Sequence, residues 1–579
     1  MRALTIPAVL CSALALGACA GTGRPAEPEA PTPVTAPAAV PATDSAAFAR
    51  FVERYLAGAP RESGDTLDWL RGHELAAGRR AAIRADSQLR ELRAVDTTQL
   101  DVPQRIDWLL VESWLKRTVH DTVLHAAART PGRYLTLGDL YWRVAGDRPP
   151  SPQEWTGIRR DLQRAPRVMA LGRSELSAPP PLWVRLALGT AQSYSGFLAG
   201  EFVQRAQAAP DSLRAPVLEA AANARIALDA YAAFLRDTLR PGPDAGWAAG
   251  ETYYDWVLRE VQFLPYGSTQ MIAEGRRIHE ATKLALDSLA QRLRPGTPWR
   301  VLADEMRSRH PDAGRIIEAY RRESRRVLAL LIRDDLVRIP PCQDLIFVPT
   351  PPQLRETYAW GGYGGITMRD SAAVGRFFVT DVVPGMTPQQ VEERLRTQND
   401  GWVSVIALHE GYPGHHLQAV YARRNPDRLR QRGGNTYYGE GWALYAEHWM
   451  ARAGLFEGNP DGQLGQLQMR LWRTARVVID PSLHTGRMSY EEAVRFFMDE
   501  VGLERSAAEA EVNRFTTWPT QAPSYIIGWL ELERLKAELQ QTLGPRFSER
   551  DFVEKVLEAG PLPLALLRRW VLHAYGLGS

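Results

Sequence analysis

Residues 409–418 read HEGYPGHHLQ and bring together several side chains that can bind a metal ion. Three of the chain's 11 histidines, His409, His415 and His416, fall in this segment, and Glu410 follows the first. Imidazole nitrogens are common metal ligands, and a carboxylate beside a bound metal can transfer a proton. The segment therefore predicts a metal site.

The spacing of these residues differs from H-E-x-x-H, in which two histidines four residues apart share one face of a helix. Pro413 stands where the second histidine would be; it cannot bind a metal, and it interrupts a helix. In an unbroken helix His416 would return to the face of His409, about 10.5 Å further along the axis. A bulge at residues 411–413 would instead bring His415 into place. The spacing alone leaves both histidines open as the second ligand.

The elements that must position these side chains are mostly helices. From about residue 45 to 335, apolar residues recur at intervals of three and four with charged residues between them. Between about 336 and 398 the chain is rich in Pro, Gly and aromatic residues, and GRFFVTDVVPG predicts a short strand near 376–383. Helices resume at Thr387. The prediction is a mostly α protein with a small β element directly upstream of the metal motif.

The motif resembles the H-E-x-x-P-G-H-H sequence of a large bacterial family known as DUF885. RTARVVIDPSLH resembles that family's R-x-x-R…D-x-x-x-H pattern, and PTQAPSYIIG resembles its P-x-Q-x-x-S-Y-x-x-G pattern. Members look like distant relatives of helical zinc metallopeptidases of the oligopeptidase and thermostable carboxypeptidase type, whose H-E-x-G-H motif is two residues shorter. The resemblance spans roughly residues 50–575 and implies a large, two-lobed helical fold like that of a metallopeptidase.

The resemblance also implies roles for the residues of the motif. It places His409 and His415 as metal ligands, with His416 as the alternative to His415, and Glu410 as the catalytic carboxylate. A third ligand, usually a carboxylate, is expected on the next helix, TYYGEGWALYAEHWMARAG, where the resemblance favours Glu440.

Further residues are expected to support the site. Glu447 lies two helical turns after Glu440 on the same face and is expected to orient a ligand imidazole. Tyr525 and His484 are candidates for stabilising the oxyanion. The strand near 376–383 resembles the edge strand that aligns substrate in such peptidases. Three more residues are expected to support the ligands or bind substrate: Arg473, Arg476 and Asp480.

These assignments predict a metal-dependent hydrolase, specifically a zinc peptidase that cleaves short peptides with metal-activated water and Glu410 as general base. Manganese or cobalt would also suit His and Glu ligands. The same site could act on a non-peptide amide or ester, because site chemistry does not choose the scissile bond. In a third alternative, Pro413 has disabled the site and the protein is an inactive binding lipoprotein of the envelope. Intact Glu410 and Glu440 argue against that alternative.

Residues 1–18 predict an export signal. Arg2 precedes an apolar run, 3–16, that is too short to span a bilayer. The following L-G-A-C resembles a bacterial lipobox, which implies cleavage before Cys19 and lipid attachment to its sulfur. Ala20 rather than Asp after the cysteine indicates the outer membrane, with the protein facing the periplasm.

Three regions are expected after the signal. Residues 20–44 are rich in Pro and Ala and predict a tether that does not fold. Residues 45–335 form an N-terminal helical region, and residues 336–579 form the region of the metal site.

Composition restricts the partners and the disulfides. The chain has 70 basic and 67 acidic residues, a net charge of +3, so nucleic acid is not an expected partner. A peptide substrate and a membrane, reached through the lipid anchor, are expected. Removal of the signal leaves only Cys19 and Cys342, which excludes a disulfide framework. Cys342 is expected to be buried as a small apolar side chain.

Overall fold

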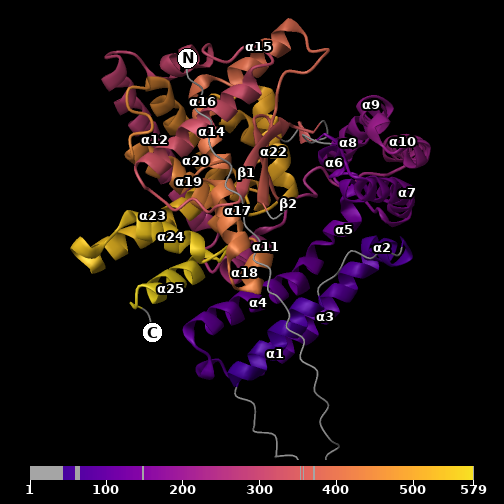
Figure 1. Cartoon of the computed structure of the whole chain (residues 1–579), viewed down its shortest axis with the longest axis horizontal. Helices are drawn as coiled ribbons and strands as arrows, with labels where there is room; N and C mark the ends of the chain where they lie inside the picture. Colours follow the sequence, from indigo (N-terminus) through magenta and orange to yellow (C-terminus); the bar gives the residue numbers. More distant parts are fainter. Residues whose placement is uncertain are drawn as a thin grey trace, which may run out of the picture. The chain divides into compact units, whose positions relative to one another are not determined.

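Helices dominate the computed structural model, which describes residues 44–58, 66–145, 149–351, 354–355, 358–369 and 372–577. The expected signal peptide, the lipidated Cys19 and the tether up to residue 43 lie outside the described residues. The first part of the described chain is helical (Figure 1): α1 (Asp44–Ala57), α2 (Thr66–His73), α3 (Leu75–Arg93), α4 (Val102–His120), α5 (Ala126–Arg129), α6 (Leu140–Val144), α7 (Pro152–Glu175), α8 (Pro181–Ala199), α9 (Glu201–Arg205), α10 (Asp211–Asp237), α11 (Glu251–Trp256), α12 (Ser268–Leu293), α13 (Trp299–Arg307) and α14 (Ile316–Arg333).

A small sheet follows, and helices then continue to the end of the described chain. The strands are β1 (Gln343–Pro349), β2 (Gly361–Arg369) and β3 (Ala372–Val379). The later helices are α15 (Pro388–Thr397), α16 (Asp400–Glu410), α17 (His415–Arg424), α18 (Arg428–Arg432), α19 (Thr436–Arg452), α20 (Pro460–His484), α21 (Tyr490–Phe496), α22 (Arg505–Thr517), α23 (Ser524–Leu543), α24 (Glu549–Glu558) and α25 (Leu564–Ala574). The predicted mostly α fold, with a β element just before the metal motif, is confirmed.

The order of the strands corrects one expectation. The sheet runs β1-β3-β2, with β1 parallel and β2 antiparallel to β3. The strand predicted near 376–383 overlaps the last residues of β3, which begins earlier and ends at Val379. β3 is the central strand and therefore cannot align a substrate at a sheet edge. Six of its eight residues are buried, so both faces of the strand are covered even though Arg376 interrupts the apolar run. The edge strand nearest the site in the chain is β2, which is interrupted by a bulge between Tyr363 and Ile366.

The described residues from 44 onward form one compact unit with more than one hydrophobic core. The largest core joins α12–α14 to the later helices, and α12 packs along α20. A separate core lies within residues 134–235, where α10 packs against α7 and α8 (Figure 1). Residue 335 is therefore not a boundary between hydrophobic cores, because helices before and after it in the chain contribute to the largest core.

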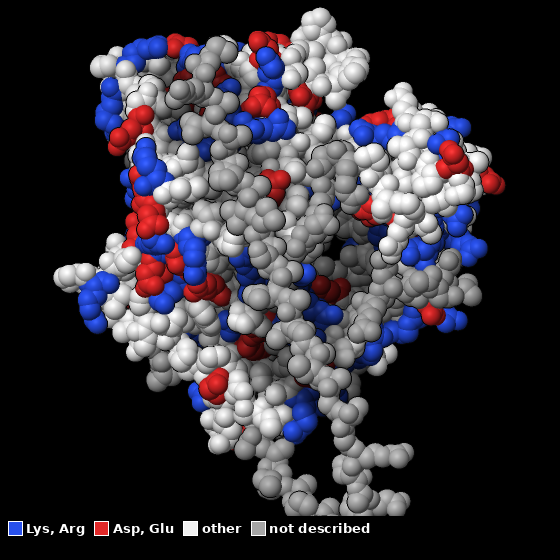
Figure 2. Space-filling view, viewed as in Figure 1, with Lys and Arg blue, Asp and Glu red and all other residues white. Residues whose placement is uncertain are grey.

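The surface carries charges of both signs. Figure 2 shows Lys and Arg next to Asp and Glu over the visible face, in agreement with the nearly equal counts in the sequence. Within the described residues, every helix is too short or too polar to cross a bilayer. Cys342 is exposed, contrary to expectation. It lies in the turn that leads into β1, with a φ of 54°.

Candidate metal centre

The HEGYPGHH motif is divided between two helices. α16 ends at Glu410 and α17 begins at His415. Between them the chain folds back, and the backbone N–H of Gly414 donates to the carbonyl of Leu408 at 3.1 Å. A Cβ on Gly414 would collide with the carbonyl oxygens of Leu408 and His409, so only glycine permits this close approach. The break at 411–414 turns His415 toward His409.

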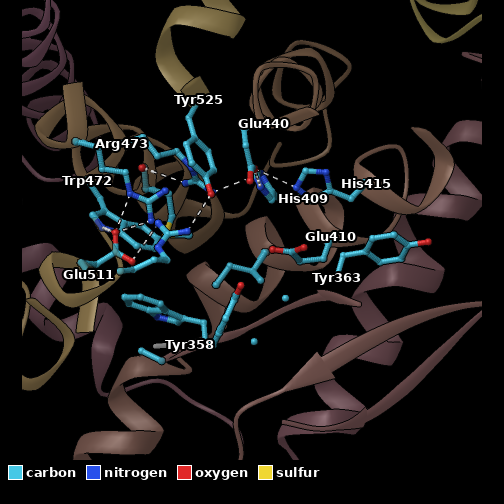
Figure 3. Close-up of a pocket in the computed structure, with 18 of the residues that line it drawn as sticks. Tyr358, Tyr363, His409, Glu410, His415, Glu440, Trp472, Arg473, Glu511 and Tyr525 are labelled. Atoms are coloured by element: carbon cyan, nitrogen blue, oxygen red, sulfur yellow. Dashed lines mark hydrogen bonds and ion pairs between the residues drawn. The ribbon is translucent and has the colours of Figure 1, made fainter. Parts of the chain in front are cut away.

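Three helices then bring their side chains to one point. His409 at the end of α16, His415 at the start of α17 and Glu440 in the second turn of α19 offer ligand atoms that lie within 4.8 Å of one another. Glu440 Oε2 is 3.5 Å from His409 Nε2 and 3.1 Å from His415 Nε2. Figure 3 shows these three side chains converging. The structure thus brings together the three residues expected as ligands.

His416, the alternative second ligand, lies elsewhere. Its side chain is fully buried, and its Nε2–H donates to Gln343 Oε1 at 2.6 Å. The hydroxyl of Tyr363 donates to Nδ1 at 3.2 Å. Burial lowers the pKa of His416 to about 4, in keeping with a neutral ring that uses one nitrogen as donor and the other as acceptor. His416 therefore links α17 to β1 and β2.

A buried carboxylate orients the first ligand. Glu447, on α19, is fully buried, and its Oε1 accepts the Nδ1–H of His409 at 2.8 Å. The same oxygen lies 2.9 Å from Arg473 Nη2. This bond holds the proton of His409 on Nδ1, so that the lone pair of Nε2 faces Glu440. Glu447 thus has the position expected of it from the sequence.

The electrostatics of the three side chains suit a cation. Burial works against the charged form of His415, but the carboxylate of Glu440 outweighs it and raises the pKa of His415 to about 9. Burial likewise opposes ionisation of Glu440, but His415 and His409 hold the pKa of Glu440 well below its usual range. Two imidazole nitrogens and one carboxylate oxygen that face one another are a donor set that fits zinc.

The ligand atoms open into a cavity of about 310 Å³. Glu410 faces this cavity (Figure 3), and no described residue forms a hydrogen bond or ion pair with its carboxylate. Gln521 donates from Nε2 to Glu440 Oε1 at 3.3 Å and lies 3.5 Å from the hydroxyl of Tyr525. Tyr525 lines the same cavity, and its ring stacks on that of His409 with centroids 6.0 Å apart. Backbone of the edge strand β2 forms part of the wall.

Two of the residues predicted on α20 reach the cavity and two do not. Arg473 and Arg476 line it, whereas Asp480 and His484 do not. The four residues follow one stripe of α20, but at 1.5 Å per residue His484 lies about 16 Å along the axis from Arg473. The structure therefore places His484 outside the lining of this cavity.

His484 and Asp480 instead hold segments of the fold together. His484 is fully buried; its Nε2–H donates to the carbonyl of Phe515 at 3.0 Å, and its Nδ1 accepts the N–H of Ala249 at 3.3 Å. Burial lowers the pKa of His484 to about 4. Asp480 Oδ2 accepts from the hydroxyl of Tyr254 at 2.6 Å and from the N–H of Thr520 at 3.1 Å. Burial raises the pKa of Asp480 to about 7.

Sequence reasoning missed two charged residues of the cavity, Glu511 and Arg514 on α22. Glu511 Oε2 accepts from Arg476 Nε at 2.8 Å and from Trp472 Nε1 at 3.1 Å. In the sequence both residues look like part of the solvent-exposed face of an ordinary helix. A signal for the site was present only in their spacing of three residues, which places them on one face.

The comparisons with known proteins show the family and the fold of the chain. A family model described as "Bacterial protein of unknown function (DUF885)" matches residues 58–571. The chain belongs to this family. A solved structure described as "a putative lipoprotein of unknown function" from Shewanella oneidensis is 20% identical, has a TM-score of 0.68 and covers 92% of this chain and 100% of its own. One described as "the putative lipoprotein from Colwellia psychrerythraea" is 17% identical, with a TM-score of 0.73 and coverage of 92% and 99%.

These two structures share the fold of this DUF885 chain. An M32 carboxypeptidase from Deinococcus radiodurans R1, 13% identical and covering 88% of this chain and 99% of its own, has a TM-score of only 0.27, which is too low to bear on fold or function. The comparison with curated proteins gave no match.

Proposed function

We propose that this DUF885 protein is a metal-dependent hydrolase, specifically a zinc peptidase that cleaves short peptides. The observation that carries the proposal is the convergence of His409 Nε2, His415 Nε2 and Glu440 Oε2 in a cavity that also holds the carboxylate of Glu410. If these side chains had only a structural role, we would expect them to form hydrogen bonds with other parts of the fold. Here the ligand atoms face one another, and no described residue engages Glu410.

A zinc ion held by His409, His415 and Glu440 would supply a Lewis acid that polarises the scissile carbonyl and makes water a stronger nucleophile. Glu410 accepts the proton that the attacking water loses, and returns it to the amide nitrogen as the C–N bond breaks. The hydroxyl of Tyr525 donates to the oxygen on which negative charge develops. Glu447, through Nδ1 of His409, keeps the first ligand in the required tautomer.

The shape of the site favours short substrates. A cavity of 310 Å³ lies near the lower end of the range of about 300–1,000 Å³ for sites that enclose small ligands. The edge strand β2 lines one wall, and its unpaired backbone groups can hydrogen-bond an extended peptide. A few residues of an extended chain fit such a site, whereas a folded protein does not.

We also propose that the protein is lipid-anchored at Cys19 in the cell envelope, at the outer membrane and facing the periplasm. The lipobox-like L-G-A-C supports the lipid anchor, and so do the two solved structures described as lipoproteins. Ala20 after the cysteine is the feature that favours the outer membrane. Zinc is the preferred metal, and manganese or cobalt would also fit the ligands.

Elemental analysis of residues 20–579 tests the metal centre, with His409→Ala, His415→Ala and Glu410→Gln beside the parent and His416→Gln as the matched control. We expect about one zinc ion per chain in the parent, Glu410→Gln and His416→Gln, and little in the two alanine variants. A parent that takes up no zinc, manganese or cobalt overturns the proposal.

A peptide library tests the reaction. We expect hydrolysis by the zinc-loaded parent and His416→Gln, and none by Glu410→Gln. If the loaded parent cleaves esters or non-peptide amides but no peptides, the hydrolase stands and the peptidase assignment fails.

A further inference from the structure

Three arginines line the cavity beside the metal centre, and two of them have a close buried carboxylate partner. Arg473, Arg476 and Arg514 all line the cavity. Arg473 pairs with Glu447, at 2.9 Å, and Arg476 pairs with Glu511, at 2.7 Å. Each of these two carboxylates is fully or almost fully buried. Arg514 makes only a longer contact, 3.5 Å, with Glu511.

The contacts of Arg514 are few and long. Its Nη2 is 3.5 Å from Glu511 Oε1, well beyond the ~2.7–2.9 Å of a charge-assisted hydrogen bond, whereas Arg476 bonds to the other oxygen, Oε2, at 2.8 and 2.7 Å. Its Nη1 reaches the hydroxyl of Tyr525 only at 3.5 Å. Within the described residues, Nε and Nη2 have no hydrogen-bond acceptor, and the side chain is only 13% exposed. A guanidinium has five N–H donors, so Arg514 has donors available for an anion.

The distance between Arg514 and the metal centre limits the size of a ligand that could reach both. Arg514 Nη1, the hydroxyl of Tyr525, Gln521 Nε2 and Glu440 Oε1 form a chain of contacts of 3.5, 3.5 and 3.3 Å. Arg514 Nη1 therefore lies at most about 10 Å from Glu440 Oε1. After the ion contact itself, this distance has room for no more than about two residues of extended peptide, at about 3.5 Å each.

The surroundings of Arg514 suit the end of a peptide. Trp472 and Trp518 line the cavity together with Arg514, and their rings offer apolar surface to a side chain. Figure 3 shows Trp472, Arg473 and Glu511 grouped on one side of Tyr525, with His415 and Tyr363 on the other.

We propose that Arg514 binds the terminal carboxylate of the peptide substrate, so that the enzyme removes one or two residues from the carboxyl end. The planar guanidinium matches a carboxylate with two parallel bonds, and binding there directs the scissile carbonyl toward the side of the cavity that holds Glu440. This inference rests on the proposed peptidase function and deepens it.

Calorimetric titration of the inactive Glu410→Gln protein, loaded with zinc, tests the inference without turnover. Three peptides of one sequence are compared: one with a free terminal carboxylate, one with a terminal carboxamide, and one carboxamide in which glutamate is the last residue. The variants are Arg514→Gln, Arg514→Lys and, as matched control on the same helix, Arg505→Gln. Arg505 is half exposed and pairs with Glu491.

We expect the free acid to bind about 10- to 100-fold more tightly than the carboxamide, as a charge-assisted contact predicts. Arg514→Gln should bring this ratio close to one, Arg514→Lys should restore part of it, and Arg505→Gln should leave it unchanged. Zinc content and melting temperature of each variant show that the fold is retained.

Four results overturn the inference: equal affinity for acid and carboxamide, a preference that survives Arg514→Gln, equal binding of the peptide with the glutamate side chain, or no binding of any peptide. The proposed function has a separate outcome. A zinc-loaded parent that cleaves free and amidated peptides equally retains the peptidase assignment and refutes the role of Arg514. A parent that binds no metal refutes the peptidase assignment, while the acid-to-carboxamide ratio of the metal-free protein still tests Arg514.

Discussion

Replacing Glu447 with glutamine tests whether the buried carboxylate behind His409 holds the metal centre in place. Oε1 of Glu447 accepts from His409 Nδ1 at 2.8 Å and lies 2.9 Å from Arg473 Nη2. Glutamine has nearly the same shape, but it removes the negative charge that both partners face. The fully buried position leaves no room for water to replace that charge.

Two separate losses are expected from this change. A ligand histidine that loses its orienting partner binds metal about 10- to 100-fold more weakly, or about 1.4–2.7 kcal/mol. Arg473 also loses its buried counter-ion, which lowers the free energy of unfolding by about 3–5 kcal/mol. Glu533→Gln is the control. Glu533 pairs with Arg452, which is on α19 as Glu447 is, but this pair is near the surface: Glu533 is 28% exposed and Arg452 is 42% exposed. That change should cost less than about 1 kcal/mol.

Chelator competition measures zinc affinity, and urea unfolding in excess chelator measures the stability of the metal-free protein, so the two losses are separated. If Glu447→Gln binds zinc as tightly as the parent does, the carboxylate does not orient His409 for metal binding. If the stability of the metal-free protein is unchanged, Arg473 does not depend on Glu447 as its counter-ion.

Three further predictions follow from the structure. Tyr525→Phe should lower kcat for peptide hydrolysis about 100- to 1,000-fold with zinc content unchanged, and a normal kcat would remove Tyr525 from the oxyanion site. Asp480→Asn tests the buried acid on α20, because burial raises the pKa of Asp480 to about 7. The protonated carboxyl therefore contributes fully to the free energy of unfolding below about pH 4, and this contribution is lost as the pH rises through 7. The asparagine variant should match the parent in urea unfolding near pH 4 and exceed it by up to about 4 kcal/mol at pH 8, and a difference independent of pH would contradict this. His484→Ala should lower the free energy of unfolding by about 2–4 kcal/mol while the protein still binds zinc; normal stability with lost kcat would instead make His484 catalytic.

Much of the fold could be predicted from local patterns. Helices follow from apolar residues at intervals of three and four, because that period sets which side chains share a face. The β element follows from a short apolar run between Gly and Pro clusters. The order of the strands could not be predicted in this way: the run that includes Phe377 and Phe378 indicates a strand, and only its buried neighbours on both sides make it central.

The candidate site, like the fold, could be predicted only in part from local sequence. The types and local spacing of His409, Glu410 and the residues after them were enough to predict a metal site, and the family motifs directed attention to Glu440. The choice between His415 and His416 depended on how the chain turns at Gly414, which a helical repeat does not contain.

Residue types and local periodicity therefore specify the side chains capable of chemistry and the helices that carry them. Which of these side chains meet depends on how the helices pack. His484 lies on the same face of α20 as Arg473, but too far along the helix to line the cavity. Arg514, on a helix without any recognisable motif, does line the cavity. The reason is physical: the repeat of a helix decides the direction of each side chain, and the packing of one helix against another decides what that side chain faces.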